Sequence, residues 1–206
     1  MKSIKALIFD FGGVMTTCSM PVRVRAITDE LGLPWDEVTK GFGKYRLDYD
    51  RGKITIKEFY DRVWQDAGLE VSDEDRRRIE EADSASWLYR NERTLAWMKQ
   101  LKKAGYRIGV LTNMPPAFVP LFREHFADFL ELADAIVISG EEGVVKPDPA
   151  IYALVQSRLG LNAEELLFID DLEKNCQAAR DCGWQALRFE ANDQVETAFA
   201  NWENKR

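Results

Sequence analysis

The stretch Ala6-Leu7-Ile8-Phe9-Asp10-Phe11-Gly12-Gly13-Val14 decides the fold of this chain. Its four apolar residues, Ala6–Phe9, predict a buried strand that runs into the carboxylate of Asp10 and then into a glycine turn. An ionised carboxylate is costly to desolvate, so an acid at a sheet edge commonly binds a metal, pairs with a cation or performs chemistry. A strand-terminal Asp before Gly is also a common turn. Position 10 alone leaves both interpretations open.

Three later stretches favour the chemical interpretation, because each presents a reactive polar group at the end of an apolar run or in a tight loop. They are 107–113, which ends in Thr112-Asn113, 143–149, which holds Lys146, and 166–171, which ends in Asp170-Asp171. Ligands bind beyond the carboxyl ends of parallel strands, so these groups should share one crevice with Asp10. An acid, a hydroxyl, a lysine and an acid pair in this order predict a phosphoryl-transfer site.

The strand pattern disappears after Val14 and returns at Arg107, and helical patterns fill the interval. The predicted helices are 22–31, 35–47, 56–67 with a capping box of Thr55 and Glu58, a charged helix after Ser72, and 92–103; the later strands are 107–112, 135–139, 165–169 and 185–189. Strands that alternate with helices indicate a parallel sheet covered on both faces. We predict an α/β fold, a Rossmann-like doubly wound parallel sheet (residues 1–15 and 90–206) with an inserted α-helical cap (residues 16–89).

In this order the motifs resemble those of the haloacid dehalogenase superfamily of hydrolases, in the branch with a helical C1-type cap after the first motif. The resemblance covers nearly the whole chain and extends to Asn175 and the segment 178–183. It implies Asp10 as the nucleophile, with Thr112 as the phosphate-binding hydroxyl, Lys146 as the charge-neutralising lysine and Asp170 as the metal-binding acid. The implied activity is that of a Mg²⁺-dependent phosphatase, which hydrolyses a small phosphorylated metabolite such as a sugar phosphate through an aspartyl-phosphate.

The expected ligands of Mg²⁺ are Asp10, the backbone carbonyl of Gly12, and Asp170, because this cation prefers hard oxygen donors. Asp171 is expected to act through a water molecule or to cap the next helix. Asn113 is placed with Thr112 and Lys146 around the phosphate, and ordering of its own loop is the alternative role.

Other polar and aromatic residues are expected to be structural. His125, the single histidine, lies in a predicted helix, so no histidine-based triad is available. The tryptophans, Trp64 and Trp87 included, are interpreted as core residues rather than as a stacking platform. Arg46 and Arg51 lie in a predicted polar loop, 45–53, where solvation is favoured over ligand binding.

Composition limits the possible partners. The chain has 206 residues and a net charge of −7 without a basic block, which argues against nucleic acid. We expect no membrane association, because no apolar run approaches the roughly 20 residues needed to cross a bilayer, and the N-terminus does not read as a secretory signal. The three cysteines are interpreted as reduced thiols, so a cytoplasmic protein is expected, as a monomer or homodimer.

One position departs from the phosphatase pattern of the superfamily. The general acid usually stands two residues after the nucleophile, and Gly12 occupies that position here. This departure argues against a phosphomutase and leaves three hypotheses: a phosphatase, a 2-haloacid dehalogenase that uses the same attacking Asp without a metal, and a catalytically weakened protein kept for binding or regulation.

Overall fold

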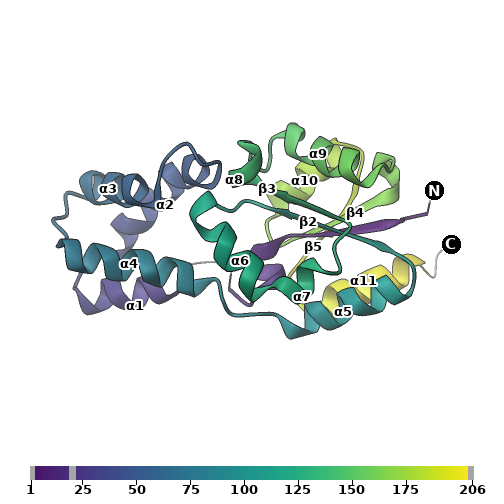
Figure 1. The fold of residues 1–206 in the computed structure, drawn as a ribbon, viewed down its shortest axis with the longest axis horizontal. Helices are drawn as coiled ribbons and strands as arrows, with labels where there is room; N and C mark the ends of the chain where they lie inside the picture. The colour runs from purple at the N-terminus through teal and green to yellow at the C-terminus, as the bar shows by residue number, and fades with distance from the viewer. Residues whose placement is uncertain (1–2, 19–21, 204–206) are drawn as a thin grey trace.

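The computed structural model describes residues 3–18 and 22–203, and its centre is one parallel β-sheet (Figure 1). The strands are β1 (Ala6–Phe9), β2 (Arg107–Thr112), β3 (Ala135–Ile138), β4 (Leu166–Asp170) and β5 (Gln185–Arg188). They lie in the order β3-β2-β1-β4-β5, and every neighbouring pair is parallel. The fold class predicted from the sequence is confirmed.

Helices cover both faces of the sheet because both faces are apolar. In β1, Leu7 and Phe9 belong to one buried cluster, whereas Ala6 and Ile8 belong to a second cluster on the opposite face. The first cluster includes side chains of α5 (Glu92–Lys103), α6 (Val119–His125), α7 (Ala127–Leu130) and α11 (Asn192–Glu203); the second includes side chains of α9 (Pro149–Leu159) and α10 (Glu173–Asp181). The short helix α8 (Ser139–Glu142) follows β3.

Four helices between β1 and β2 form a separate layer, drawn at the left of Figure 1. They are α1 (Val22–Glu30), α2 (Trp35–Asp50), α3 (Ile56–Ala67) and α4 (Asp73–Ser86). Their apolar faces meet in a third buried cluster, which includes Phe59, Tyr60, Trp64 and Ile79. The predicted cap, residues 16–89, spans these four helices, and we keep it as the proposed boundary.

Local sequence signals account for several helix ends. Helix α3 begins at the predicted capping box of Thr55 and Glu58 and ends at Gly68, which has a φ of 66°. Helix α2 differs from the prediction, because it continues to Asp50 and includes much of the segment 45–53 that was predicted as a polar loop. Along the parts of the chain that the structure describes, no helix has the length and apolar character needed to cross a membrane.

Candidate active site

Asp10 follows the carboxyl end of β1, where the chain turns into the loop Phe11–Met15. Its Oδ1 atom accepts a hydrogen bond of 2.7 Å from the backbone N–H of Phe11, and the residue is only 6% exposed. Burial raises the pKa of Asp10, while the positive charge of Lys146 opposes that rise. A further cation beside Asp10 would favour the ionised form that a nucleophile needs.

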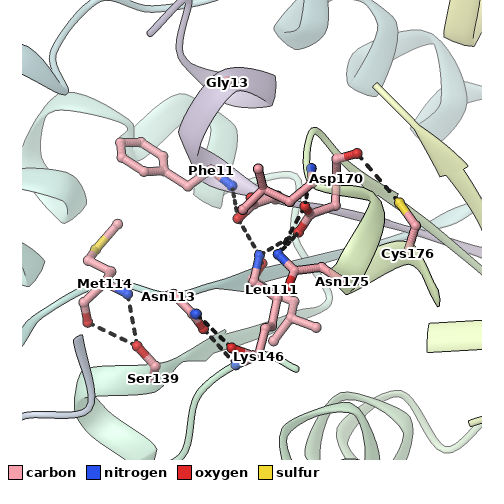
Figure 2. A network of polar contacts seen from close by, with 12 residues as sticks. Phe11, Gly13, Leu111, Asn113, Met114, Ser139, Lys146, Asp170, Asn175 and Cys176 are labelled. Atoms are coloured by element: carbon pink, nitrogen blue, oxygen red, sulfur yellow. Dashed lines mark hydrogen bonds and ion pairs between the residues drawn. The ribbon is translucent and has the colours of Figure 1, made fainter. Parts of the chain in front are cut away.

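Lys146 lies between the carboxylates of the first and fourth motifs. Its Nζ is 2.7 Å from Asp10 Oδ1 and 2.7 Å from Asp170 Oδ2, and it also donates to the carbonyl of Leu111 at 3.3 Å (Figure 2). Burial by itself lowers the pKa of Lys146, but Asp10 and Asp170 outweigh it and hold the pKa above its usual value. The lysine is therefore a fixed positive charge in the interior, as its assigned role requires.

Asn113 holds the backbone of Lys146 from both sides. Its Oδ1 accepts from the N–H of Lys146 at 2.7 Å, and its Nδ2 donates to the carbonyl of Lys146 at 3.0 Å (Figure 2). Of the two roles considered for Asn113, this geometry favours ordering of the Lys146 loop over direct contact with a substrate. Thr112, at the end of β2, is 1% exposed.

Asp170 is enclosed by hydrogen-bond donors. Its Oδ1 accepts from the N–H of Leu172 at 2.8 Å, its Oδ2 accepts from Lys146, and Asn175 Nδ2 lies 3.0 Å from both oxygens (Figure 2). The residue has no exposed surface. These contacts fix the positions of Lys146 and Asn175, so Asp170 organises the site whatever else it binds.

Asp171 is placed differently from its neighbour. Its carboxylate is half-buried and faces the glycine turn: a Cβ atom at Gly13 would lie 2.8 Å from Asp171 Oδ2. Burial and the adjacent charge of Asp170 raise the pKa of Asp171 to about 6. This carboxylate accepts a hydrogen bond from its own backbone N–H, while Lys146 and Arg188 act on it through their charge.

The donor set around Asp10 suits a divalent cation. Asp10, Asp170 and Asp171 each offer one carboxylate oxygen, and these three oxygens lie within 4.8 Å of one another. Three carboxylates face one ammonium group, and such an excess of buried negative charge is costly unless a cation joins it. Asn175 lines the same cavity, and its buried Oδ1 has no hydrogen-bond partner among the described residues. Hard oxygen donors of this kind fit Mg²⁺.

A cavity of about 430 Å³ lies between the sheet and the cap. The core contributes Asp10, Gly12, Thr112, Lys146 and Asp171, as the sequence predicted for one crevice, whereas Asp170, which was predicted with them, is fully buried behind the lining. The cap and the linker that follows α4 contribute a second set: Trp35, Thr39, Phe42, Arg46, Leu47, Tyr49, Asp50, Asp83, Ser84 and Trp87.

One sequence interpretation is corrected in this second set. Arg46 lies in helix α2 rather than in a solvated loop, and its Nε donates to Asp50 Oδ1 at 2.8 Å, inside the cavity wall. Trp64 is a core residue as expected, and Trp87 packs against the core cluster and also lines the cavity. The sequence signal for Arg46 was its spacing of four residues from Asp50, which is the spacing of a helical ion pair.

The remaining candidates lie outside the cavity. His125 is exposed at the end of α6, and the structural role predicted for it stays a prediction. Arg51 donates to the carbonyl of Leu47 at the end of α2. Cys18, Cys176 and Cys182 are free thiols.

A parallel sheet with an acid at the end of β1, a buried lysine and an acid pair after β4 defines a class of hydrolases. Residues 4–183 match the haloacid dehalogenase-like hydrolases, and the chain belongs to this family. The sesquiterpene phosphatase astK of Aspergillus oryzae is 28% identical over 193 residues, which cover 91% of this chain and 90% of that protein. The D-ribitol-5-phosphate phosphatase of Bacteroides thetaiotaomicron is 27% identical over 201 residues, covering 91% and 92%.

The fold is also that of a solved structure. A family enzyme of Bacteroides thetaiotaomicron, in complex with magnesium and inorganic phosphate, superimposes with a TM-score of 0.69 at 23% identity, covering 92% of this chain and 96% of that one. The chain is thus a hydrolase whose similar proteins include named phosphatases.

Proposed function

We propose that this protein is a Mg²⁺-dependent phosphatase that hydrolyses a small phosphate monoester through a phosphorylated Asp10. The observation that carries the proposal is the contact of Lys146 Nζ, at 2.7 Å, with both Asp10 and Asp170 at the wall of the cavity. A buried ammonium between two carboxylates neutralises charge where an anionic ester must approach an anionic nucleophile. The phosphatases among its relatives support the same activity.

In the proposed first step, a carboxylate oxygen of Asp10 attacks phosphorus and the bond from phosphorus to the leaving oxygen breaks. The leaving oxygen takes a proton from water, because Gly12 offers no acid. Water then attacks the phosphorus of the aspartyl-phosphate, which releases inorganic phosphate and restores the carboxylate. Thr112 and the backbone amides of the turn after Asp10 would bind the non-bridging oxygens.

We propose Asp10, Asp170, Asp171 and the backbone carbonyl of Gly12 as the groups that hold Mg²⁺. Bound there, the ion would supply the positive charge that lets the phosphate and the carboxylates approach each other. The oxygens of Asp170 already accept several hydrogen bonds, so we assign the larger share of cation binding to Asp10 and Asp171. The free thiols support the proposed cytoplasmic location.

The test is an assay of acetyl phosphate and p-nitrophenyl phosphate with Mg²⁺, with EDTA, and with the Asp10→Asn variant. We expect phosphate release that needs the metal and is lost in the variant. Chloroacetate serves as the parallel substrate. Release of chloride without a metal would identify a dehalogenase instead. If neither phosphate nor chloride were released, the protein would be a binding or regulatory protein rather than either enzyme.

A further inference from the structure

Apolar and aromatic side chains make up a large part of the wall of the cavity above Asp10. Three large hydrophobic side chains are exposed in the described part of the chain: Leu47 (37%), Tyr89 (42%) and Leu172 (46%). Two of them, Leu47 from the cap and Leu172 from the core, line this one cavity, and Tyr89 does not. Single exposed leucines are common, but two in the same concave surface mark a place where an apolar group binds.

Aromatic rings continue the apolar surface toward the nucleophile. Trp35 and Phe42 from the cap and Phe118 from the core line the cavity with Met114. A Cβ atom at Gly12 would lie 3.3 Å from Cζ3 of Trp87, so this ring lies directly against the turn that follows Asp10. The organic group of a phosphate bound at Asp10 would therefore be in contact with rings and methyl groups.

Several polar cap residues in the cavity have partners within the protein. Arg46 pairs with Asp50, and its guanidinium lies over the rings of Tyr49 and Trp87 at 5.6 and 5.5 Å from their centroids. Trp87 Nε1 donates to Asp83 Oδ1 at 3.2 Å. The hydroxyl of Thr39 donates to the carbonyl of Asp36 at 3.0 Å. These partners compete with the hydroxyl groups of a polyol, and a hydroxyl group buried without a hydrogen bond costs binding free energy.

From this lining we infer that the phosphatase acts on phosphate monoesters of hydrophobic alcohols, with an alkyl or aryl group of several carbons, in preference to polyol phosphates. The inference rests on the proposed function and specifies its substrate class. Leu47 and Leu172 are the specificity-determining residues, because they offer exposed apolar surface that only a hydrophobic organic group would remove from water.

The experiment is a series of n-alkyl phosphates from ethyl to octyl, compared with glycerol 3-phosphate and ribitol 5-phosphate, all with Mg²⁺. The leaving-group pKa changes little along the alkyl series, so chain length reports apolar contact alone. We expect kcat/KM to rise by about three- to fourfold for each methylene group until the cavity is filled. A flat series, or polyol phosphates that exceed hexyl phosphate, would overturn the inference.

Leu47→Ser and Leu172→Ser should each reduce the ratio of the hexyl to the ethyl kcat/KM by about fivefold or more, chiefly through KM. Tyr89→Ser is the matched control, because it removes the third exposed side chain outside the cavity, and its ratio should equal that of the wild type. If the ratio of the hexyl to the ethyl kcat/KM were unchanged from the wild type in all three variants, both the assignment of Leu47 and Leu172 and the inference would be wrong. Acetyl phosphate distinguishes a failure of the substrate class from a failure of the proposed function. If the enzyme hydrolyses acetyl phosphate but prefers polyol phosphates, only the substrate class is wrong. If it does not hydrolyse acetyl phosphate, the proposed function is wrong too.

Discussion

A carbon added at Gly12 would lie 3.3 Å from the ring carbon Cζ3 of Trp87. The backbone of Gly12 has a φ of −63° and a ψ of 128°, which any residue can adopt, so packing against Trp87 is what opposes a side chain there. Trp87 follows α4 in the sequence, and its ring occupies the space beside Asp10 where a side chain at position 12 would stand.

We predict that Gly12→Asp lowers the free energy of unfolding by about 1–3 kcal/mol, because the ring of Trp87 must shift. The matched control is Gly43→Asp on helix α2, where an added Cβ meets no atom within 4 Å. Urea unfolding of both variants checks this. If Gly12→Asp were as stable as Gly43→Asp, the ring of Trp87 would be able to shift without a cost in free energy, and the prediction would be wrong.

The absence of an acid at position 12 should make turnover depend steeply on the leaving group. General acid catalysis contributes typically about 10²–10⁴-fold, and it matters most for poor leaving groups. We expect aryl and acyl phosphates to be hydrolysed faster than alkyl phosphates of similar size, with a steep plot of log kcat/KM against leaving-group pKa. A flat plot would mean that another cavity residue supplies the proton.

Asp10→Asn should abolish turnover and leave the fold intact. The amide is nearly isosteric but neutral, so the attacking oxygen and one cation ligand are lost together. We expect a decrease of about 10⁴-fold or more in kcat, measured by phosphate release, with an unchanged circular dichroism spectrum. Substantial residual turnover in this variant would remove Asp10 from the role of nucleophile.

The two acids after β4 should respond differently to substitution. The sequence favours Asp170 as the direct ligand, but its oxygens already accept hydrogen bonds from Lys146, Asn175 and Leu172. We therefore expect Asp171→Asn to raise the Mg²⁺ concentration for half-maximal activity by more than about tenfold. Asp170→Asn should instead lower the free energy of unfolding by about 3 kcal/mol, because Lys146 loses a buried partner. Both variants are to be measured by Mg²⁺ titration of activity and by urea unfolding. If Asp170→Asn raised the Mg²⁺ requirement more than Asp171→Asn did, Asp170 would be the direct ligand.

Asp134 should give the fold a pH-dependent stability. Its Oδ2 accepts from the backbone N–H of Ile108 in β2 and from Lys102 in α5, and these bonds outweigh partial burial and lower its pKa. A lowered pKa stabilises the folded state above the unfolded pKa of about 3.9, and the effect is lost as pH falls through the folded value. We expect Asp134→Asn to cost about 1 kcal/mol at pH 7, less as the pH approaches 3.5, in urea unfolding. The exposed Asp29→Asn is the control, and a loss that is independent of pH would contradict the assignment.

The sequence by itself determined the order of the elements and the residues around the nucleophile. Apolar runs fixed the strands within a residue or two, and the capping box of Thr55 and Glu58 fixed the start of α3. These signals are local: a strand needs a short apolar run, and a helix start needs one side chain within three residues. Asp10, Thr112, Lys146 and Asp171 meet in one cavity because parallel strands place their carboxyl ends at one edge.

Only the tertiary structure decided which of these residues contact one another. Asn113 clamps Lys146 across 33 positions of sequence, and Trp87 packs against the turn at Gly12 from the far end of the cap. The difference between Asp170 and Asp171 likewise depends on which one meets Lys146. No local pattern encodes such contacts, because they arise only when segments that are distant in the sequence pack together and each polar atom takes the partner that packing brings within reach.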